Sequence, residues 1–269
     1  MPTSFLMCRP KYYEVTYVIN PWMEGNVHKT NPALATQQWN AFYEQLKQAA
    51  TVKLIEPQPN LPDLVFTANA GLLQGKRFVL SHFHHPERQP EEPVFKRWFE
   101  QNGFEVLEVP EDIFFEGAGD GLFQPGEDLL WMGHGIRSDL SAKALLEDYF
   151  SAEIIPLQLI NNNFYHLDTC FCPLLEGYVM YFPSAFDQPS NARIEKQVPK
   201  KKRIVVSQED ALNFCCNAVL ADRTIFINAA TDSLRKALEG LGYTVLIQPV
   251  TEFNKAGGAN KCLTLELEI

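Results

Sequence analysis

The sequence has no long apolar run. Its longest weakly charged stretch, residues 156–183, contains three consecutive asparagines, His166 and Asp168, so no transmembrane helix is expected. The first ten residues lack a basic segment followed by an apolar core, which predicts that there is no signal peptide. Six cysteines in 269 residues, none in a Cys-x-x-Cys pair, are too few for a disulfide framework and give only a weak metal signal. These absences predict a cytoplasmic protein with reduced cysteines, no bound metal and no membrane contact.

Basic residues are also scarce. The chain has 23 Lys and Arg against 33 Asp and Glu, a net charge of −10. Nucleic acid is not expected as a partner, because phosphate binding needs a dense basic face. A cationic small molecule is compatible with this charge. No G-x-x-x-x-G-K-[ST] motif occurs, and GAGDG at 117–121 lacks the spacing of a dinucleotide motif, so no nucleotide cofactor is expected.

One design recurs five times along the chain: a short strand of Val, Ile and Leu, a polar turn-rich stretch, and then a hairpin. We expect these strands at 51–57, 104–110, 152–158, 202–208 and 243–249, about 40–55 residues apart. Helices are expected before three of them, at 37–50, 93–102 and 232–242. Five modules favour a closed α/β ring of blades, one domain over residues 1–269, because closure limits exposed sheet edges. An ordinary mixed α+β domain is the alternative.

In such a ring the polar stretches converge on one central point. A Cys, a His and carboxylates together are the set for nucleophilic catalysis, in which the thiolate attacks and the imidazole moves a proton. Cys262 is the preferred nucleophile because the glycines of AGGAN before it let the backbone approach a ligand closely. The polar side chains are Asp63 and Asn69, Glu116 and Asp120, Asn163, His166 and Asp168, Asn213 and Asn217, and Asn260 and Cys262.

Carboxylates beside a thiol, rather than beside further histidines, indicate recognition of a cation instead of a metal. Glu116 and Asp168 can each pair with a planar guanidinium through two parallel hydrogen bonds. A hydrogen-bonded core histidine is the alternative interpretation of His166. Its place in a loop, with Asp168 two residues further on, favours a functional role.

Five motifs stand in a characteristic order: DLVFTANAG, FEGAGDGL, GHGIRSD, YHLDT and GGANKC. In this combination, and over nearly its full length, the chain resembles the guanidino-group-modifying superfamily, the penteins. This superfamily includes arginine deiminases, dimethylarginine dimethylaminohydrolases and amidinotransferases. The resemblance implies a five-bladed α/β propeller with a central active site that needs no metal or organic cofactor.

The resemblance also implies roles for single residues. Cys262 corresponds to the nucleophile and His166 to the general acid and base. Glu116 is expected to bind the guanidinium and orient His166, while Asp168 holds the guanidinium from another side. The remaining residues expected to bind substrate are Arg137 and Arg88, which resemble the arginines that grip the α-carboxylate, together with Asn69 and Asn20.

Asn69 departs from the arginine deiminase pattern, which has an Asp at this place. An Asp only accepts hydrogen bonds, whereas an Asn also donates and can hold the neutral ureido group of citrulline. FLMCRP, YVINPWM and TANAG look most like the arginine dihydrolase branch, in which arginine and water give ornithine, carbon dioxide and two ammonia. The expected substrate is therefore L-arginine or a related guanidino compound. An arginine deiminase, a dimethylarginine dimethylaminohydrolase, an amidinotransferase and a non-enzymatic binding protein remain as alternatives, and the oligomeric state is open.

Overall fold

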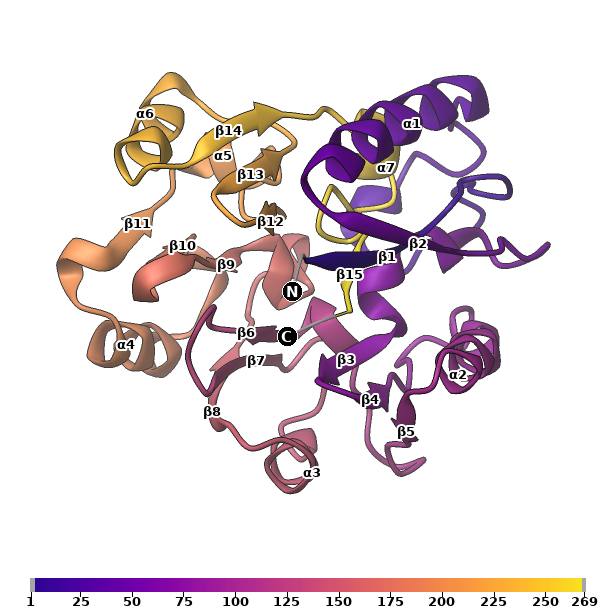
Figure 1. Ribbon diagram of the computed structural model, residues 1–269, viewed down its shortest axis with the longest axis horizontal. Helices are drawn as coiled ribbons and strands as arrows, with labels where there is room; N and C mark the ends of the chain where they lie inside the picture. The colour runs from indigo at the N-terminus through magenta and orange to yellow at the C-terminus, as the bar shows by residue number, and fades with distance from the viewer. Residues whose placement is uncertain (1–2, 268–269) are drawn as a thin grey trace.

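Five small three-stranded sheets stand around a common axis in the computed structural model, which describes residues 3–267 (Figure 1). In each sheet the central strand pairs antiparallel with one neighbour and parallel with the other. In chain order the sheets consist of β1 (Ser4–Cys8), β2 (Thr51–Ile55) and β15 (Leu265–Glu266); β3 (Gly71–Gln74), β4 (Arg77–Leu80) and β5 (Glu105–Leu107); β6 (Gly121–Phe123), β7 (Leu129–His134) and β8 (Glu153–Gln158); β9 (Phe171–Pro173), β10 (Val179–Tyr181) and β11 (Arg203–Val205); and β12 (Val219–Ala221), β13 (Thr224–Ile227) and β14 (Thr244–Ile247).

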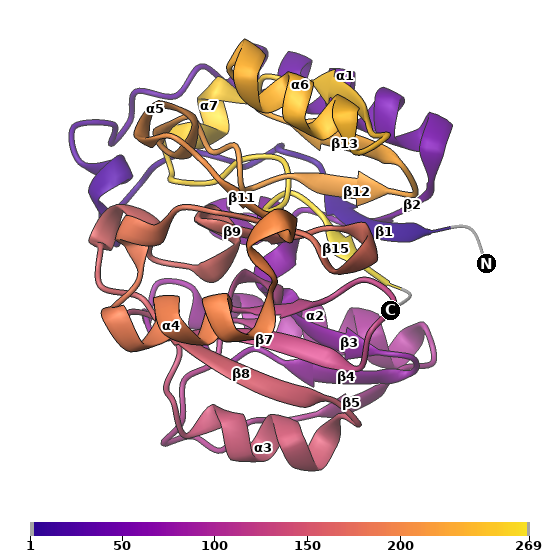
Figure 2. The same cartoon turned by 90° about the vertical axis from the view of Figure 1, so that its left-hand side faces the viewer.

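A helix joins the central strand of each sheet to its parallel partner and lies on the outside of the ring (Figures 1 and 2). Parallel strands need such a crossover, whereas in the second to fifth sheets the antiparallel pair is joined by a short turn. The five crossover helices are α1 (Pro32–Ala49), α2 (Glu92–Gln101), α3 (Ala142–Tyr149), α4 (Gln188–Gln197) and α6 (Asp232–Gly240). Two shorter helices, α5 (Gln208–Leu212) and α7 (Thr251–Asn254), lie in the connections between blades. No helix within residues 3–267 is both long and apolar enough to cross a membrane.

The ring closes through pairing between strands from opposite ends of the sequence. Strand β15 pairs antiparallel with β1, with Phe5 opposite Glu266 and Leu6 opposite Leu265. This pairing completes the first blade and leaves the ring without a gap, which confirms the predicted five-bladed α/β propeller.

Local sequence signals explain where the helices begin and end. Asn31 accepts a hydrogen bond from the Leu34 amide and is followed by Pro at the first helical position, so α1 begins five residues earlier than expected. Gly103 and Gly242 follow α2 and α6 with φ of +78° and +82°. Only glycine adopts this left-handed conformation without strain, which explains both helix–glycine–strand joints.

The sheet boundaries differ from the expected modules in one respect. Each predicted repeat began on the strand that follows a helix, but that strand is the last of its sheet, and the polar stretch after it leads into the next blade. The polar stretches therefore connect blades instead of lying within them. Each of them ends in a tight turn immediately before the first strand of a hairpin or, in the last case, before β15, and these turns lie together at the centre of the ring.

Candidate active site

The Cys262 thiol lies in the turn before β15 and is 2% exposed. Its Sγ accepts a hydrogen bond from Asn217 Nδ2 at 3.1 Å and donates one to Asp168 Oδ2 at 3.4 Å. Position 258 has no room for a side chain, because a Cβ on Gly258 would lie 2.6 Å from the Phe66 ring and 3.2 Å from Cys262 Cβ. In this structure Gly258 therefore lets the turn pack against Phe66, and the close approach to a ligand expected from AGGAN stays a prediction.

The pKa of the Cys262 thiol is raised well above its ordinary value. Burial contributes most, followed by the negative charge of Asp168, while the Ala259 backbone amide and Asn217 act in the opposite direction. Burial also raises the pKa of Asp168 to about 7, against the lowering influence of Cys262, Lys261 and Asn217. In the ligand-free site the thiol therefore keeps its proton at neutral pH.

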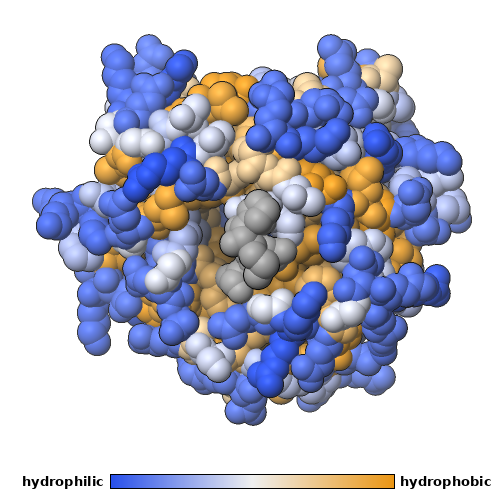
Figure 3. Space-filling model, in the orientation of Figure 1, coloured by the Kyte–Doolittle hydropathy of each residue, from blue (hydrophilic) through white to orange (hydrophobic). Residues whose placement is uncertain are grey.

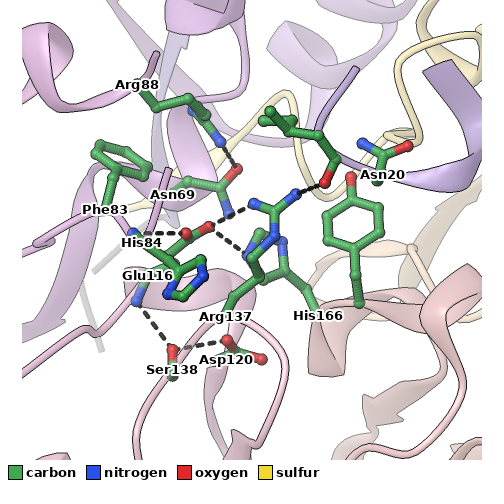
Figure 4. A network of polar contacts seen from close by, with 12 residues as sticks. Asn20, Asn69, Phe83, His84, Arg88, Glu116, Asp120, Arg137, Ser138 and His166 are labelled. Carbon is green, nitrogen blue, oxygen red and sulfur yellow. Dashed lines mark hydrogen bonds and ion pairs between the residues drawn. The ribbon is translucent and has the colours of Figure 1, made fainter. Parts of the chain in front are cut away.

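A second group of residues surrounds the Glu116 carboxylate (Figure 4). Its Oε2 lies 2.7 Å from His166 Nε2 and accepts a hydrogen bond of 3.0 Å from Arg137 Nη1, while Oε1 accepts from the His84 amide. Burial alone would raise the pKa of Glu116, but Arg137 and His166 together hold it well below its usual range. Glu116 is thus a buried anion that fixes the orientation of the imidazole.

The other imidazole nitrogen is free for chemistry. His166 Nδ1 is buried and has no hydrogen-bond partner among the described residues, and the same holds for Asn69 Nδ2. Both atoms face Gly119: a Cβ there would lie 2.5 Å from Asn69 Nδ2 and 3.1 Å from His166 Nδ1. The glycine leaves a small space between a proton-transfer group and an amide donor.

Asp120 supports this arrangement from behind. Its two carboxylate oxygens accept hydrogen bonds from the Leu167 amide at 3.0 Å and from the Ser138 hydroxyl at 2.7 Å. Ser138 Oγ in turn accepts from the Glu116 amide. Asp120 therefore ties together the turns that carry Glu116 and His166, and it is a structural residue of the site.

Arg88 fixes the orientation of the Asn69 amide. Its Nη1 donates to Asn69 Oδ1 at 2.8 Å (Figure 4). Its Nε and Nη2 bind the Glu91 carboxylate at 3.0 and 2.8 Å. Because arginine only donates, the atom of Asn69 that faces it must be the oxygen. The amide nitrogen is thereby directed away from Arg88, as a donor without a partner.

A narrow cavity lies beside these groups. Cys262, Asn69, Arg88 and Arg137 line it, and the face of the Arg137 guanidinium lies over the Tyr165 ring at 4.7 Å. Asn20 also lines it, although both ends of its amide are engaged: Oδ1 accepts from the Trp22 and Met23 amides and Nδ2 donates to Ala256 O. The structure thus brings all eight predicted residues to one region, while their roles stay predictions.

Asp63 was given no role by sequence reasoning, although it lines the same cavity. Its Oδ2 accepts a hydrogen bond from the Tyr17 hydroxyl at 2.8 Å, and its Oδ1 is buried without a partner. The backbone carbonyl of Ile19, which accepts from Arg137 Nη2 at 2.8 Å, was also missed. The only sequence signal for Asp63 was its place at the start of DLVFTANAG, and a backbone carbonyl has no side-chain signal at all.

A wider cavity lies on the other side of Asp168, on the face where the described chain ends meet. Figure 3 views this face along the ring axis, with hydrophilic side chains around the rim and more apolar ones toward the centre. The wider cavity is lined by Asp168 and Lys261 but not by Cys262, whereas Cys262 lines the narrower one, so we place the candidate chemistry there. Among residues 3–267, no three His, Cys, Asp or Glu side chains are grouped as a metal site would require.

The five-bladed propeller with its buried Cys, His and Glu is the arrangement expected of the penteins, and comparison with known families gives the same result. A family model described as N,N dimethylarginine dimethylhydrolase, eukaryotic, matches residues 14–269. The chain therefore belongs to the dimethylarginine dimethylaminohydrolase type of the penteins. This confirms the resemblance seen in the five sequence motifs.

Among individual proteins, the chain is 53% identical over 263 residues to AgrE, a bifunctional arginine dihydrolase/ornithine cyclodeaminase of Nostoc sp.. That match covers 98% of the chain but 37% of AgrE, so the chain spans about a third of this relative's length. It is also 31% identical over 264 residues to the N(G),N(G)-dimethylarginine dimethylaminohydrolase of Mycobacterium tuberculosis, covering 98% of the chain and 85% of that protein.

Solved structures of ArgZ, the corresponding bifunctional protein of Synechocystis sp., are also similar. The N-terminal domain of ArgZ in a cysteine-to-serine variant bound to substrate superposes with a TM-score of 0.98 at 50% identity, covering 99% of this chain and 98% of that one. An asparagine-to-serine variant of the same domain, covalently bound to a reaction intermediate, gives a TM-score of 0.97 and covers 98% and 97% of the two chains.

Proposed function

We propose that the chain hydrolyses the guanidino group of L-arginine to ornithine, carbon dioxide and two ammonia. The observation that carries the proposal is the free Asn69 amide nitrogen beside the free His166 Nδ1, with Asn69 lining the same cavity as Cys262. The similarity to AgrE and ArgZ over almost the whole chain supports it.

The cavity presents the charges that an amino-acid substrate requires. Arg88 and Arg137 are the groups proposed to bind the α-carboxylate, and the unpartnered Asp63 Oδ1 can accept a hydrogen bond from the α-ammonium group. The anions proposed to bind the guanidinium are Asp168, whose Oδ1 is buried and unpartnered, and Glu116.

The cationic substrate would itself activate the Cys262 thiol that attacks it. Burial and Asp168 keep the Cys262 thiol protonated in the free site. A guanidinium that binds beside Asp168 neutralises that charge and favours both the carboxylate and the thiolate. His166, the proposed general base and acid, takes the thiol proton and later gives it to the departing ammonia, so the sulfur becomes nucleophilic only when a cation is in place.

The reaction then takes two rounds at the same carbon. The thiolate forms a bond to the guanidinium carbon, His166 protonates the departing ammonia, and the resulting thiouronium is attacked by water to give citrulline and free thiol. Asn69 donates to the ureido oxygen and retains citrulline for a second attack, which expels the second ammonia. Water releases the carbamate of ornithine, which loses carbon dioxide.

Product analysis with purified protein tests this proposal. Arginine consumed, citrulline and ornithine are measured for the native chain and for Cys262→Ser. We expect ornithine in proportion to arginine consumed and no turnover by Cys262→Ser. Citrulline accumulating alone would exclude the dihydrolase, and full turnover by Cys262→Ser would exclude the nucleophile.

Hydrolysis of dimethylarginine is the second candidate, since the matching family model and the relative from M. tuberculosis carry that name. Asp168 argues for unsubstituted arginine, because its free Oδ1 needs an N–H donor that a dimethylated nitrogen does not supply. Comparing kcat/KM for arginine and dimethylarginine decides between the two. An amidinotransferase would instead depend on an added amine acceptor.

A further inference from the structure

We propose that Asn217 is a positioning residue that holds the Cys262 sulfur in place and stabilises it in the thiolate form. The inference rests on the proposed role of Cys262 as the nucleophile. Asn217 precedes β12, two residues before the strand begins, in the connection between the fourth and fifth blades. Sequence reasoning placed it among the polar stretches but gave it no role.

The side chain of Asn217 is fully buried and uses both ends of its amide. Its Oδ1 accepts hydrogen bonds from the Ala259 and Cys262 backbone amides, both at 3.1 Å. Its backbone oxygen accepts a third, from the Lys261 amide at 3.1 Å. Asn217 thus accepts hydrogen bonds from three backbone amides of the turn that carries the thiol.

These bonds leave only one orientation for the amide nitrogen. Because Oδ1 is bound to two backbone donors, Nδ2 must point the other way, toward Cys262 Sγ at 3.1 Å and the Asp168 backbone oxygen at 3.3 Å. A hydrogen bond to a charged acceptor is about twice as strong as one between neutral groups. The Nδ2 donor therefore favours the thiolate over the thiol.

The charges around the thiol make this donor important. The Asp168 carboxylate lies beside Cys262 and disfavours a negative charge on the sulfur, while Lys261 is its neighbour in the chain. Arg137, Asp63 and the Tyr165 ring line the same cavity as Cys262. In the free site, Asn217 is the neutral side chain that donates directly to the sulfur. The same bond persists when the sulfur is expelled from the carbon at the end of each round.

The test compares Asn217→Ala with Asn228→Ala. Asn228 is also a buried asparagine that joins two loops, donating to Asn213 O at 3.0 Å and accepting from the Val250 amide at 2.9 Å, and no hydrogen bond links it to Cys262. The measurement is the rate at which iodoacetamide alkylates Cys262, followed by mass spectrometry across a range of alkaline pH. The alkylation measurement requires no substrate, so it tests the role of Asn217 even if the protein does not hydrolyse arginine.

For Asn217→Ala we expect alkylation of Cys262 to slow about 10- to 100-fold at each pH below the thiol pKa, which is the loss expected for one hydrogen bond to a charged group. Asn228→Ala is expected to stay within about 2-fold of the native rate, even if both variants unfold at similarly lowered temperatures. An unchanged or faster rate in Asn217→Ala would overturn the proposal.

A second variant covers the case in which Asn217→Ala does not fold. Asn217→Asp keeps an oxygen for the Ala259 and Cys262 amides but replaces the Nδ2 donor. We expect alkylation of Cys262 to slow at least as much, because the donor is lost and a carboxyl group is added. A native alkylation rate in this variant would also reject the inference.

Discussion

The imidazole of His166 and the carboxylate of Glu116 are both buried, and Nε2 of the one lies 2.7 Å from Oε2 of the other. This contact leaves Nδ1 as the only imidazole nitrogen available to a substrate. The side chains come from turns of neighbouring blades, so the ring itself sets their distance. The imidazole proposed to transfer protons is therefore oriented before any ligand binds.

The first prediction concerns Glu116→Gln. It removes the anion that orients His166 and leaves Arg137 buried without its partner. We expect the rate of arginine hydrolysis to fall about 100-fold or more and the free energy of unfolding to fall by about 3 kcal/mol. Steady-state kinetics and urea unfolding measure the two effects.

Glu252→Gln is the matched control for that experiment, because Glu252 is also buried and pairs with Lys255 outside the candidate site. It is expected to lower stability with little change in kcat. Equal losses of kcat in the two variants would show that Glu116 acts only through stability.

The second prediction concerns Asn69→Asp. An aspartate can still accept from Arg88, but it cannot donate to the ureido oxygen of citrulline. We expect arginine to be consumed while citrulline leaves the enzyme, so that ornithine formation falls about 10-fold or more relative to citrulline. Chromatography of the products measures this ratio. Unchanged conversion to ornithine would contradict the role given to the Asn69 amide nitrogen.

The third prediction concerns Gly119→Ala. The added Cβ would enter the space beside Asn69 Nδ2, at 2.5 Å, and His166 Nδ1, at 3.1 Å. We expect turnover to be nearly lost and stability to fall by about 1–3 kcal/mol. Gly240→Ala, which meets no atom within 4 Å and lies in α6, is the control and is expected to preserve activity. Native activity in Gly119→Ala would show that the space is not used.

The fourth prediction concerns stability against pH. Burial raises the folded-state pKa of Asp168 from 3.8 to about 7, so the folded protein binds a proton there that the unfolded chain has already lost. The stabilising contribution of the Asp168 carboxyl to the free energy of unfolding is fully present below about pH 4 and is lost as the pH rises through about 7. Over that window, Asp168→Asn should gain stability relative to the native chain by an amount on the order of 4 kcal/mol. The free energy of unfolding is measured by urea titration of both proteins at a series of pH values. The same pH dependence in both proteins would contradict this prediction.

Much of the architecture follows from local sequence pattern. The five apolar strands, the glycines at 103 and 242 and the hairpins were all visible, because each depends on residues close together in the chain. Helices α3 and α4 were missed. Helix α3 has eight residues, and α4 buries only Ser190 and Ile194, so neither has a strong apolar face. The sheet boundaries were also misplaced, since pairing between distant strands leaves no local signal.

Residues of the candidate site could be predicted where the residue type itself is reactive. They could not be predicted where their role depends on a contact with a residue far away in the sequence. Cys262 and His166 could be selected for reactivity. The hydrogen bond from Asn217 to Cys262 joins residues 45 positions apart, and the hydrogen bond from Arg137 to the Ile19 carbonyl joins residues 118 positions apart. Only the closed ring brings such groups together.

The most direct test of the central claim is the amount of ammonia released per arginine consumed, with Cys262→Ser as the blank. The account predicts two ammonia for each arginine, with ornithine as the amino-acid product and none formed by the variant. A ratio of one, with citrulline as the product, would contradict it.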